Sequence, residues 1–117
     1  MTRDELFALC ASLVGAVEDY PFGDGVAVFK VCGKMFALVP VDDSAPSVTL
    51  KCDPDLALEL RARHAAVRPG YHTNKRHWNT VDLDGTIPDD EVEDMVTHSH
   101  ALVVSRLPKA ERALLQG

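Results

Sequence analysis

The sequence lacks long hydrophobic runs and paired cysteines, and both absences exclude classes of protein. No segment approaches the roughly 18 consecutive apolar residues of a membrane-spanning helix. The N-terminal segment MTRDELFALC carries acidic side chains ahead of its first apolar turn, unlike a secretory signal peptide. Cys10, Cys32 and Cys52 form no CxxC pair, and an odd number of cysteines cannot all pair within one chain. We therefore expect a cytoplasmic protein with no membrane partner and with buried, reduced thiols, of which Cys32 in a turn is the most exposed.

Motifs that carry catalysis or bind metals are also missing. The sequence has no HExxH, GxSxG or CxxC motif, and no glycine-rich segment leads into Lys-Ser or Lys-Thr. His72 and His77 would point to opposite faces of one strand, and His98 and His100 would lie about 200° apart on a helix, so neither pair can share a metal. We expect no metal, no cofactor and no catalytic residue, and therefore a protein that is not an enzyme.

What is present describes one globular domain. The 117 residues are 46% hydrophobic and 26% charged, which are ordinary values for a folded, soluble protein. A chain of this length has room for one hydrophobic core, so we expect a single domain over residues 1–117.

Hydrophobic periodicity and turn residues predict the secondary structure. Thr2 and Glu5 have the spacing of a capping box, and Asp53 followed by Pro54 is typical of a helix start. The expected helices cover 2–14, 53–64 and 88–107, with a short terminal turn at ERALL. The expected strands cover 26–31, 34–39, 47–52 and 74–83.

The first two of these strands are predicted to form a hairpin. Cys32 and Gly33 alone separate them, and a two-residue link that contains glycine favours a tight turn. The register then pairs Phe29 with Phe36 on the core face and leaves Lys30 on the other face.

The order of elements favours an α+β domain with two layers. Strands linked by short turns form an antiparallel sheet, and three helices are enough to cover one of its faces. The other face is then left open. Alternation over 47–52 places Val48, Leu50 and Cys52 in the core and puts Thr49 and Lys51 on the open face.

Charge is strongly segregated along the chain. Twelve Lys and Arg residues stand against eighteen Asp and Glu residues, so a protein that coats nucleic acid through bulk charge is excluded. Residues 61–81 nevertheless contain no acid. This segment holds Arg61, Arg63, Arg68, Lys75 and Arg76, three histidines, and the aromatic residues Tyr71 and Trp78. This composition is compatible with a surface for an anionic partner, of which nucleic acid is the first candidate. The alternative is a solvated basic edge, with Tyr71 and Trp78 in the core.

Several segments carry a resemblance to a known family: YPFGDGVAVFKVCGKMFALV (20–39), LKCDPDLALELR (50–61), PGYHTNKRHWNTVDLDGTIPDDEV (69–92) and SHALVVSRLPK (99–109). The part YHTNKRHWN is the most specific. With these segments the chain resembles the MmcQ/YjbR family of small bacterial proteins. The resemblance implies a double-wing α+β domain, similar to the DNA-binding domain of a phage transcription activator, and it implies DNA as the partner.

The resemblance and the charge pattern point to the same segment, 68–79. The expected nucleic-acid-binding residues are Lys30, Lys51, Arg68, Tyr71, His72, Asn74, Lys75, Arg76, His77, Trp78 and Asn79. The Lys and Arg side chains would contact phosphates, and the aromatic and Asn side chains would contact sugars or bases.

Two other functions fit the same residues. The first is a small-molecule-binding protein or an uncharacterised enzyme for an anionic ligand, with His72, Lys75, Arg76 and His77 lining its pocket. The second is an interaction domain that pairs through its open sheet face or an edge strand. Of the possible oligomeric states, we favour a monomer.

Overall fold

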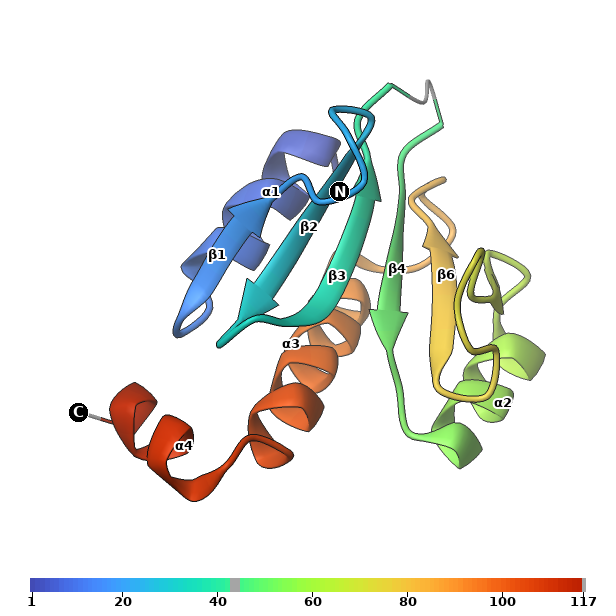
Figure 1. Cartoon of the computed structure of the whole chain (residues 1–117). Helices are drawn as coiled ribbons and strands as arrows, with labels where there is room; N and C mark the ends of the chain where they lie inside the picture. The colour runs from blue at the N-terminus through green and yellow to red at the C-terminus, as the bar shows by residue number, and fades with distance from the viewer. Residues whose placement is uncertain (43–44, 117) are drawn as a thin grey trace.

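One antiparallel sheet and the helices packed on it make up the fold, which is an α+β fold as predicted (Figure 1). It is seen in a computed structural model that describes residues 1–42 and 45–116. Within these residues the elements are α1 (Arg3–Ser12), β1 (Ala16–Asp19), β2 (Val26–Val31), β3 (Lys34–Pro40), β4 (Ser47–Lys51), α2 (Pro54–Arg63), β5 (Val67–Pro69), β6 (Trp78–Asp82), α3 (Asp89–Ser105) and α4 (Lys109–Gln116). The strand order is β1-β2-β3-β4-β6-β5. In Figure 1, α1 and α3 lie behind the sheet, while α4 follows the end of α3 at the lower left, with Leu115 packed against the edge of the core.

Both strands at the sheet edges escaped the sequence prediction. β1 is a short edge strand whose side chains are mostly exposed, so it shows no alternation of buried and polar residues. β5 is only three residues long and ends at Pro69, which an edge position tolerates because its missing N–H faces no partner strand.

The strand predicted over 74–83 is shorter than expected. It begins at Trp78, because Asn74 starts a turn instead. The Asn74 side-chain oxygen accepts a hydrogen bond from the Arg76 N–H at 3.0 Å, and its carbonyl accepts one from the His77 N–H at 3.2 Å. Such local bonds compete with strand pairing.

The β2–β3 hairpin is confirmed, but part of its predicted register is wrong. Cys32 and Gly33 have φ angles of 48° and 78°, the left-handed values that a type I′ turn needs. Lys30 pairs with Met35 as predicted, whereas Phe29 pairs with Ala37 instead of Phe36 because a β-bulge shifts the register.

The bulge keeps both phenylalanines in the core. Phe29 and Phe36 are fully buried, with ring centroids 6.3 Å apart. Phe7 of α1 packs edge-on against Phe29 at 5.4 Å. Burial of one such side chain contributes about 1.5–3 kcal/mol to the free energy of unfolding. Phe29 and Phe36 belong to the hydrophobic core on the helix-covered face, which therefore holds most of the stabilising apolar contact.

The open face carries one row of side chains across the whole sheet. The strand registers align Asp19, Val28, Leu38, Thr49, Thr80 and Arg68, in that order from β1 to β5. The hydroxyls of Thr49 and Thr80 hydrogen-bond each other at 2.8 Å. The predicted placement of Thr49 on the open face and Leu50 in the core is therefore confirmed.

A buried serine joins α3 to the middle of the sheet. β3 and β4 pair at Ala37–Leu50 and Leu38–Thr49, and Ser99 occupies the place of the next pair. Its hydroxyl donates to the Phe36 carbonyl at 2.6 Å and accepts from the Lys51 N–H at 2.9 Å. Ser99 is fully buried, so these two backbone groups have no access to water at that point.

We expect Ser99→Ala to lower the free energy of unfolding by about 1–3 kcal/mol, because it leaves buried backbone groups unpaired. Urea denaturation measures the change. Ser105→Ala is the matched control. Ser105 also lies on α3, but it is exposed and bonds only within its own helix, to the Leu102 carbonyl. Equal losses in the two variants would contradict the role given to Ser99.

Candidate functional site

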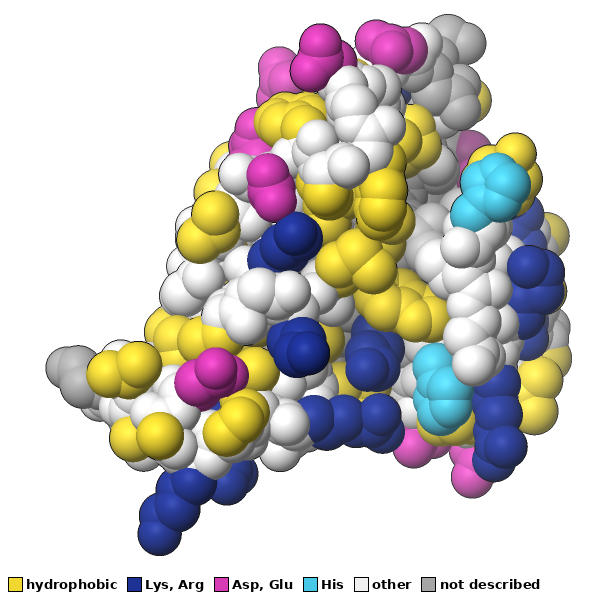
Figure 2. Space-filling model, viewed as in Figure 1, with side chains coloured by type: hydrophobic (Ala, Val, Ile, Leu, Met, Phe, Trp, Pro, Cys, Tyr) yellow, Lys and Arg dark blue, Asp and Glu magenta, His cyan; other side chains and the backbone are white. Residues whose placement is uncertain are grey.

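The open face of the sheet is hollowed into a groove of about 850 Å³, here called the open-face groove. Its floor is formed by side chains of β2, β3, β4 and β6, among them Met35, Leu38 and Thr49. Phe22, from the loop 20–25, lines one wall. Tyr71 and His72, from the loop 70–77, line the other. Figure 2 looks onto this face and shows apolar side chains running down its middle.

The groove has a basic end and an acidic end. Figure 2 shows Lys and Arg side chains over the lower part and right edge of this face, and Asp and Glu side chains over its upper end. Figure 1 shows the β2–β3 hairpin turn and the end of β4 at the lower edge of the sheet, with the C-terminal end of α3 below and behind them. These three places carry Lys34, Lys51 and Arg106, which we call the basic end. None of the three lines the groove itself, and Lys51 also lines a cavity on the helix-covered side of the sheet.

The three cations of the basic end act on one another. Desolvation lowers the pKa of the Lys51 ammonium below its usual value, and the charges of Arg106 and Lys34 lower it further. None of the three forms an ion pair with a carboxylate of the described residues. The fold therefore places two further cations within electrostatic range of Lys51.

Lys30 lies on the open face as predicted, and Arg68 lies on the same face, but each has an acidic neighbour. The Lys30 ammonium lies 3.0 Å from Asp19, and the Arg68 guanidinium bonds both carboxylate oxygens of Asp82 at 3.0 and 3.2 Å. Arg68 also lines the open-face groove. Their charge is partly neutralised by these pairs, unlike that of Lys51.

Tyr71 and His72 form a fixed aromatic wall. The Tyr71 N–H donates to the Thr80 hydroxyl at 3.0 Å, and the Tyr71 and His72 ring centroids are 4.0 Å apart. His72 has a φ of 57°, a left-handed conformation that non-glycine residues rarely adopt. The two rings are thus presented to solvent by a strained, hydrogen-bonded loop.

Lys75 and Arg76 point to a different surface from Lys51. They line a separate hollow of about 430 Å³ together with Pro54, Asp55, Leu58 and Arg61 of α2. The predicted basic patch is therefore divided by the loop 70–77, with the groove on one side and this hollow on the other. Asn74, His77 and Trp78 connect the two: Trp78 pairs with Lys51 across β6 and β4, and the His77 carbonyl accepts from the Cys52 N–H at 2.8 Å.

Asn79 must be removed from the predicted contact surface. Its side chain is 2% exposed and lies on the helix-covered side of β6. The Asn79 amide oxygen accepts from Arg61 Nε at 2.7 Å, and its nitrogen donates to the Ala57 carbonyl at 3.4 Å. Asn79 links α2 to the sheet and has no surface left for a ligand.

Arg61 anchors the loop that carries the aromatic wall. Besides Asn79, its guanidinium donates to the Trp78 carbonyl at 3.2 Å and to the Lys75 carbonyl. The loop can close on β6 only because residue 70 is glycine: a Cβ there would lie 2.7 Å from Trp78 Cβ. Arg61, assigned to the basic segment by sequence, is a structural residue.

Sequence reasoning missed Lys34 and Arg106. Lys34 follows the hairpin glycine and Arg106 caps α3, and neither position stands near the acid-free segment 61–81. No pattern along the chain links them. Only the folded arrangement brings them to Lys51.

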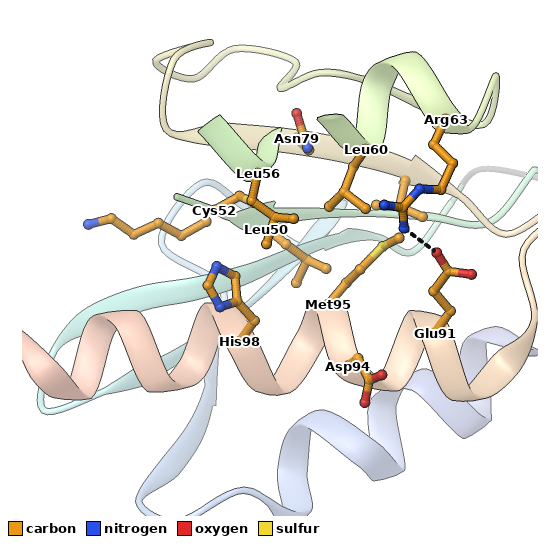
Figure 3. Close-up of a pocket in the computed structure, with 12 residues that line it drawn as sticks. Leu50, Cys52, Leu56, Leu60, Arg63, Asn79, Glu91, Asp94, Met95 and His98 are labelled. Carbon is orange, nitrogen blue, oxygen red and sulfur yellow. Dashed lines mark ion pairs between the residues drawn. The ribbon is translucent and has the colours of Figure 1, made fainter. Parts of the chain in front are cut away.

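A second cavity of about 270 Å³ lies on the helix-covered side, between α2 and α3 (Figure 3). Leu56, Leu60 and Met95 point into it, and the pair of Arg63 and Glu91, 3.6 Å apart, stands at one end. Cys52 also lines this cavity, and burial raises its pKa to about 11.

The thiols behave as predicted. Burial raises the pKa of Cys10 to about 12, so the Cys10 and Cys52 thiols stay protonated at neutral pH and are poor nucleophiles. Cys32 in the hairpin turn is exposed.

Over 1–42 and 45–116, no group of three His, Cys, Asp or Glu side chains is arranged to hold a metal ion. Within the same ranges, no helix is long and apolar enough to cross a membrane.

Comparison with known proteins confirms the resemblance seen in the sequence. The family model named YjbR matches residues 11–102. This chain belongs to the YjbR family. It is 39% identical over 115 residues to the uncharacterized protein YjbR of Escherichia coli K12, covering 98% of both chains. It is 36% identical over 93 residues to the uncharacterized protein YbdF of Escherichia coli O157:H7, covering 80% of this chain and 76% of that protein.

Solved structures of relatives share the fold. The crystal structure of Deinococcus radiodurans protein DR2400, with the family-model domain DUF419, superposes with a TM-score of 0.91 at 40% identity, covering 98% of this chain and 88% of that one. A crystal structure of a Pseudomonas syringae protein superposes with a TM-score of 0.76 at 26% identity, covering 88% of this chain and 99% of that one. The YjbR family architecture therefore extends over nearly the whole chain.

We expect Arg61→Met to loosen the loop 70–77, because it removes three hydrogen bonds and leaves the buried Asn79 oxygen unpaired. Trypsin cleavage after Lys75 and Arg76 should become at least about tenfold faster, since cleavage follows the population of the open loop. Arg63→Met is the control, because Arg63 lies on the same helix but pairs with Glu59 and Glu91. Equal cleavage rates in both variants would show that Arg61 does not hold the loop.

We expect Lys51→Met to raise Tm at neutral pH by roughly 1–4 °C. A lysine whose pKa is lowered by folding binds its proton more tightly when unfolded, so its charge opposes folding below its folded pKa. This cost disappears above the unfolded pKa, so the gain in Tm should vanish at strongly alkaline pH. Calorimetry over a pH series measures it, with the exposed Lys109→Met as control. A Tm lowered by Lys51→Met would contradict the repulsion described for the basic end.

Proposed function

We propose that this YjbR-family chain is a DNA-binding protein that holds the sugar-phosphate backbone at the basic end of the open-face groove. The carrying observation is that Lys and Arg side chains gather over the lower part of this face (Figure 2), where Lys34 and Arg106 lie near enough to lower the pKa of Lys51 and none of the three has a carboxylate partner among the described residues. An anion between these cations would relieve their repulsion, and phosphate groups bind Lys and Arg clusters by releasing condensed counterions.

The net charge of the chain supports a localised contact. With a formal charge of −6, most of the surface repels DNA, so attraction is confined to the places where cations gather. The loop 70–77 adds a second basic surface beside the first, with Lys75 and Arg76 exposed at its tip. DNA that follows the lower edge of the sheet would meet both.

Binding without catalysis fits the chemistry of the groove. The polar groups on its floor are largely hydroxyls, from Ser47, Thr49, Thr73 and Thr80. The hydroxyls of Thr49 and Thr80 bond each other, and His72, which also lines the groove, forms no hydrogen bond with either of them in the described part of the chain. The groove supplies surfaces and charges for recognition, and we assign it no reaction.

A small anionic molecule is the second candidate ligand. The groove volume, about 850 Å³, lies in the range of small-molecule sites, and Arg68 and His72 both line it. A phosphorylated metabolite that raises Tm in the absence of any DNA affinity would favour this alternative.

Fluorescence anisotropy of a labelled DNA duplex, titrated with the protein over about 25–200 mM salt, tests the proposal. We expect saturable binding that weakens as salt rises. The double variant Lys51→Gln with Arg106→Gln should bind more weakly, and the slope of log K against log salt should become shallower by about one to two.

A matched control removes the same charge elsewhere. Lys109→Gln with Arg112→Gln takes two exposed cations from α4, away from the groove, and should leave the slope of log K against log salt within about half a unit of the native value. If the α4 pair weakens binding as much as the Lys51 and Arg106 pair, the attraction is not localised and the assignment is wrong. Absence of binding at the lowest salt would reject DNA as the partner.

A further inference from the structure

We infer that the open-face groove takes unpaired bases, so that the preferred ligand is single-stranded DNA rather than a duplex. The inference rests on the proposed DNA-binding function and specifies its substrate class. It is carried by two exposed aromatic side chains on the groove walls, by the composition of the floor, and by the position of the cations at one end.

The walls offer aromatic surface that the protein itself does not cover. Phe22 is 65% exposed and Tyr71 is 66% exposed, although both are large and apolar. Tyr71 is held in place by its N–H bond to Thr80 and by its contact with the His72 ring. Proteins that bind single strands combine exposed aromatic rings, on which the bases stack, with a positively charged surface that attracts the backbone.

A duplex cannot use these rings in the same way. Its bases already stack on one another and hide their faces, and its major groove is entered by a helix or a two-stranded ribbon that protrudes from the protein. The surface here is the reverse, because the apolar side chains lie on the floor of a hollow. A hollow with aromatic walls therefore suits an unstacked base, as found in single-stranded DNA.

The groove is wide enough for more than one base. The strands nearest its two walls, β2 and β6, are three positions apart in the sheet, which corresponds to about 14 Å at the usual strand spacing. Stacked bases follow one another at about 3.4 Å, so two or three fit between the walls. Met35 and Leu38 are half-buried on the floor and offer apolar contact below the bases, which does not demand one sequence.

Charge fixes how the strand would lie. The upper end of the groove carries acids, including Asp42, whose carboxylate lies close to Gly25 in the loop that bears Phe22. Phosphates are repelled from that end and attracted to Lys34, Lys51 and Arg106 at the other. The backbone therefore crosses the lower end of the sheet, and its bases turn upward into the groove.

The test compares three labelled probes with the whole chain at one salt concentration. The probes are an oligothymidylate of about 12 nucleotides, a duplex of the same length, and a strand of the same length whose central nucleotides are abasic. We expect the oligothymidylate to bind at least about tenfold more tightly than the duplex, and the abasic strand to lose most of that advantage. Fluorescence of Trp78, the one tryptophan of the sequence, which pairs with Lys51, should change with the oligothymidylate.

Variants separate stacking from charge. Tyr71→Ala and Phe22→Ala should each weaken oligothymidylate binding about five- to hundredfold and reduce its advantage over the duplex. Tyr71→Phe keeps the ring and should retain the affinity. Leu114→Ala is the control, since Leu114 is an equally exposed apolar residue on α4 outside the groove. Because all these side chains are exposed, circular dichroism should show the native fold in each variant.

Two failures are distinguishable. If duplex binds as tightly as the oligothymidylate, and Tyr71→Ala weakens both equally or neither, then DNA binding stands and the groove does not take unpaired bases. If none of the three probes binds at low salt, the proposed function itself has failed.

Discussion

The candidate site depends on the guanidinium of Arg61. This one group, on α2, bonds the Asn79 side chain inside the fold and the carbonyls of Lys75 and Trp78 at the surface. It therefore ties a helix, an inner strand and the loop 70–77 together. Without that loop the open-face groove would lack one of its two walls. A part-buried polar contact on the helix-covered side thus shapes one wall of the groove on the open face.

A second constraint acts at the middle of the sheet. Strands β3 and β4 separate after two pairs, and the Ser99 hydroxyl takes up the backbone groups left by that separation. Lys51 lies at the point of separation, so the serine that completes the core hydrogen bonds also fixes the backbone of a cation at the basic end. Lys51 therefore matters both for stability and for the candidate function. The Ser99 hydroxyl, on the helix-covered side, holds its backbone in place near the other two cations.

The sequence predicted the elements that carry a recognisable residue pattern and missed the elements that carry none. Alternation found β4, the turn at Cys32 and Gly33 found the hairpin, and the capping box of Thr2 and Glu5 is present in α1. The edge strands β1 and β5 were missed because short exposed strands carry no pattern. The bulge at Phe36 was missed because two apolar neighbours leave the register ambiguous from sequence alone.

The candidate site shows the same division at the level of single residues. Charge counting along the chain drew attention to 68–79, but it could not separate exposed cations from cations that hydrogen-bond within the fold. Arg61 and Asn79 proved to be internal, while Lys34 and Arg106 came from segments with no marked composition. What distinguishes the two groups is pairing: Arg61 has three acceptors within the fold, and the basic end has no carboxylate among the described residues. A cation that the fold leaves unpaired among other cations is the one free to meet an anion from outside.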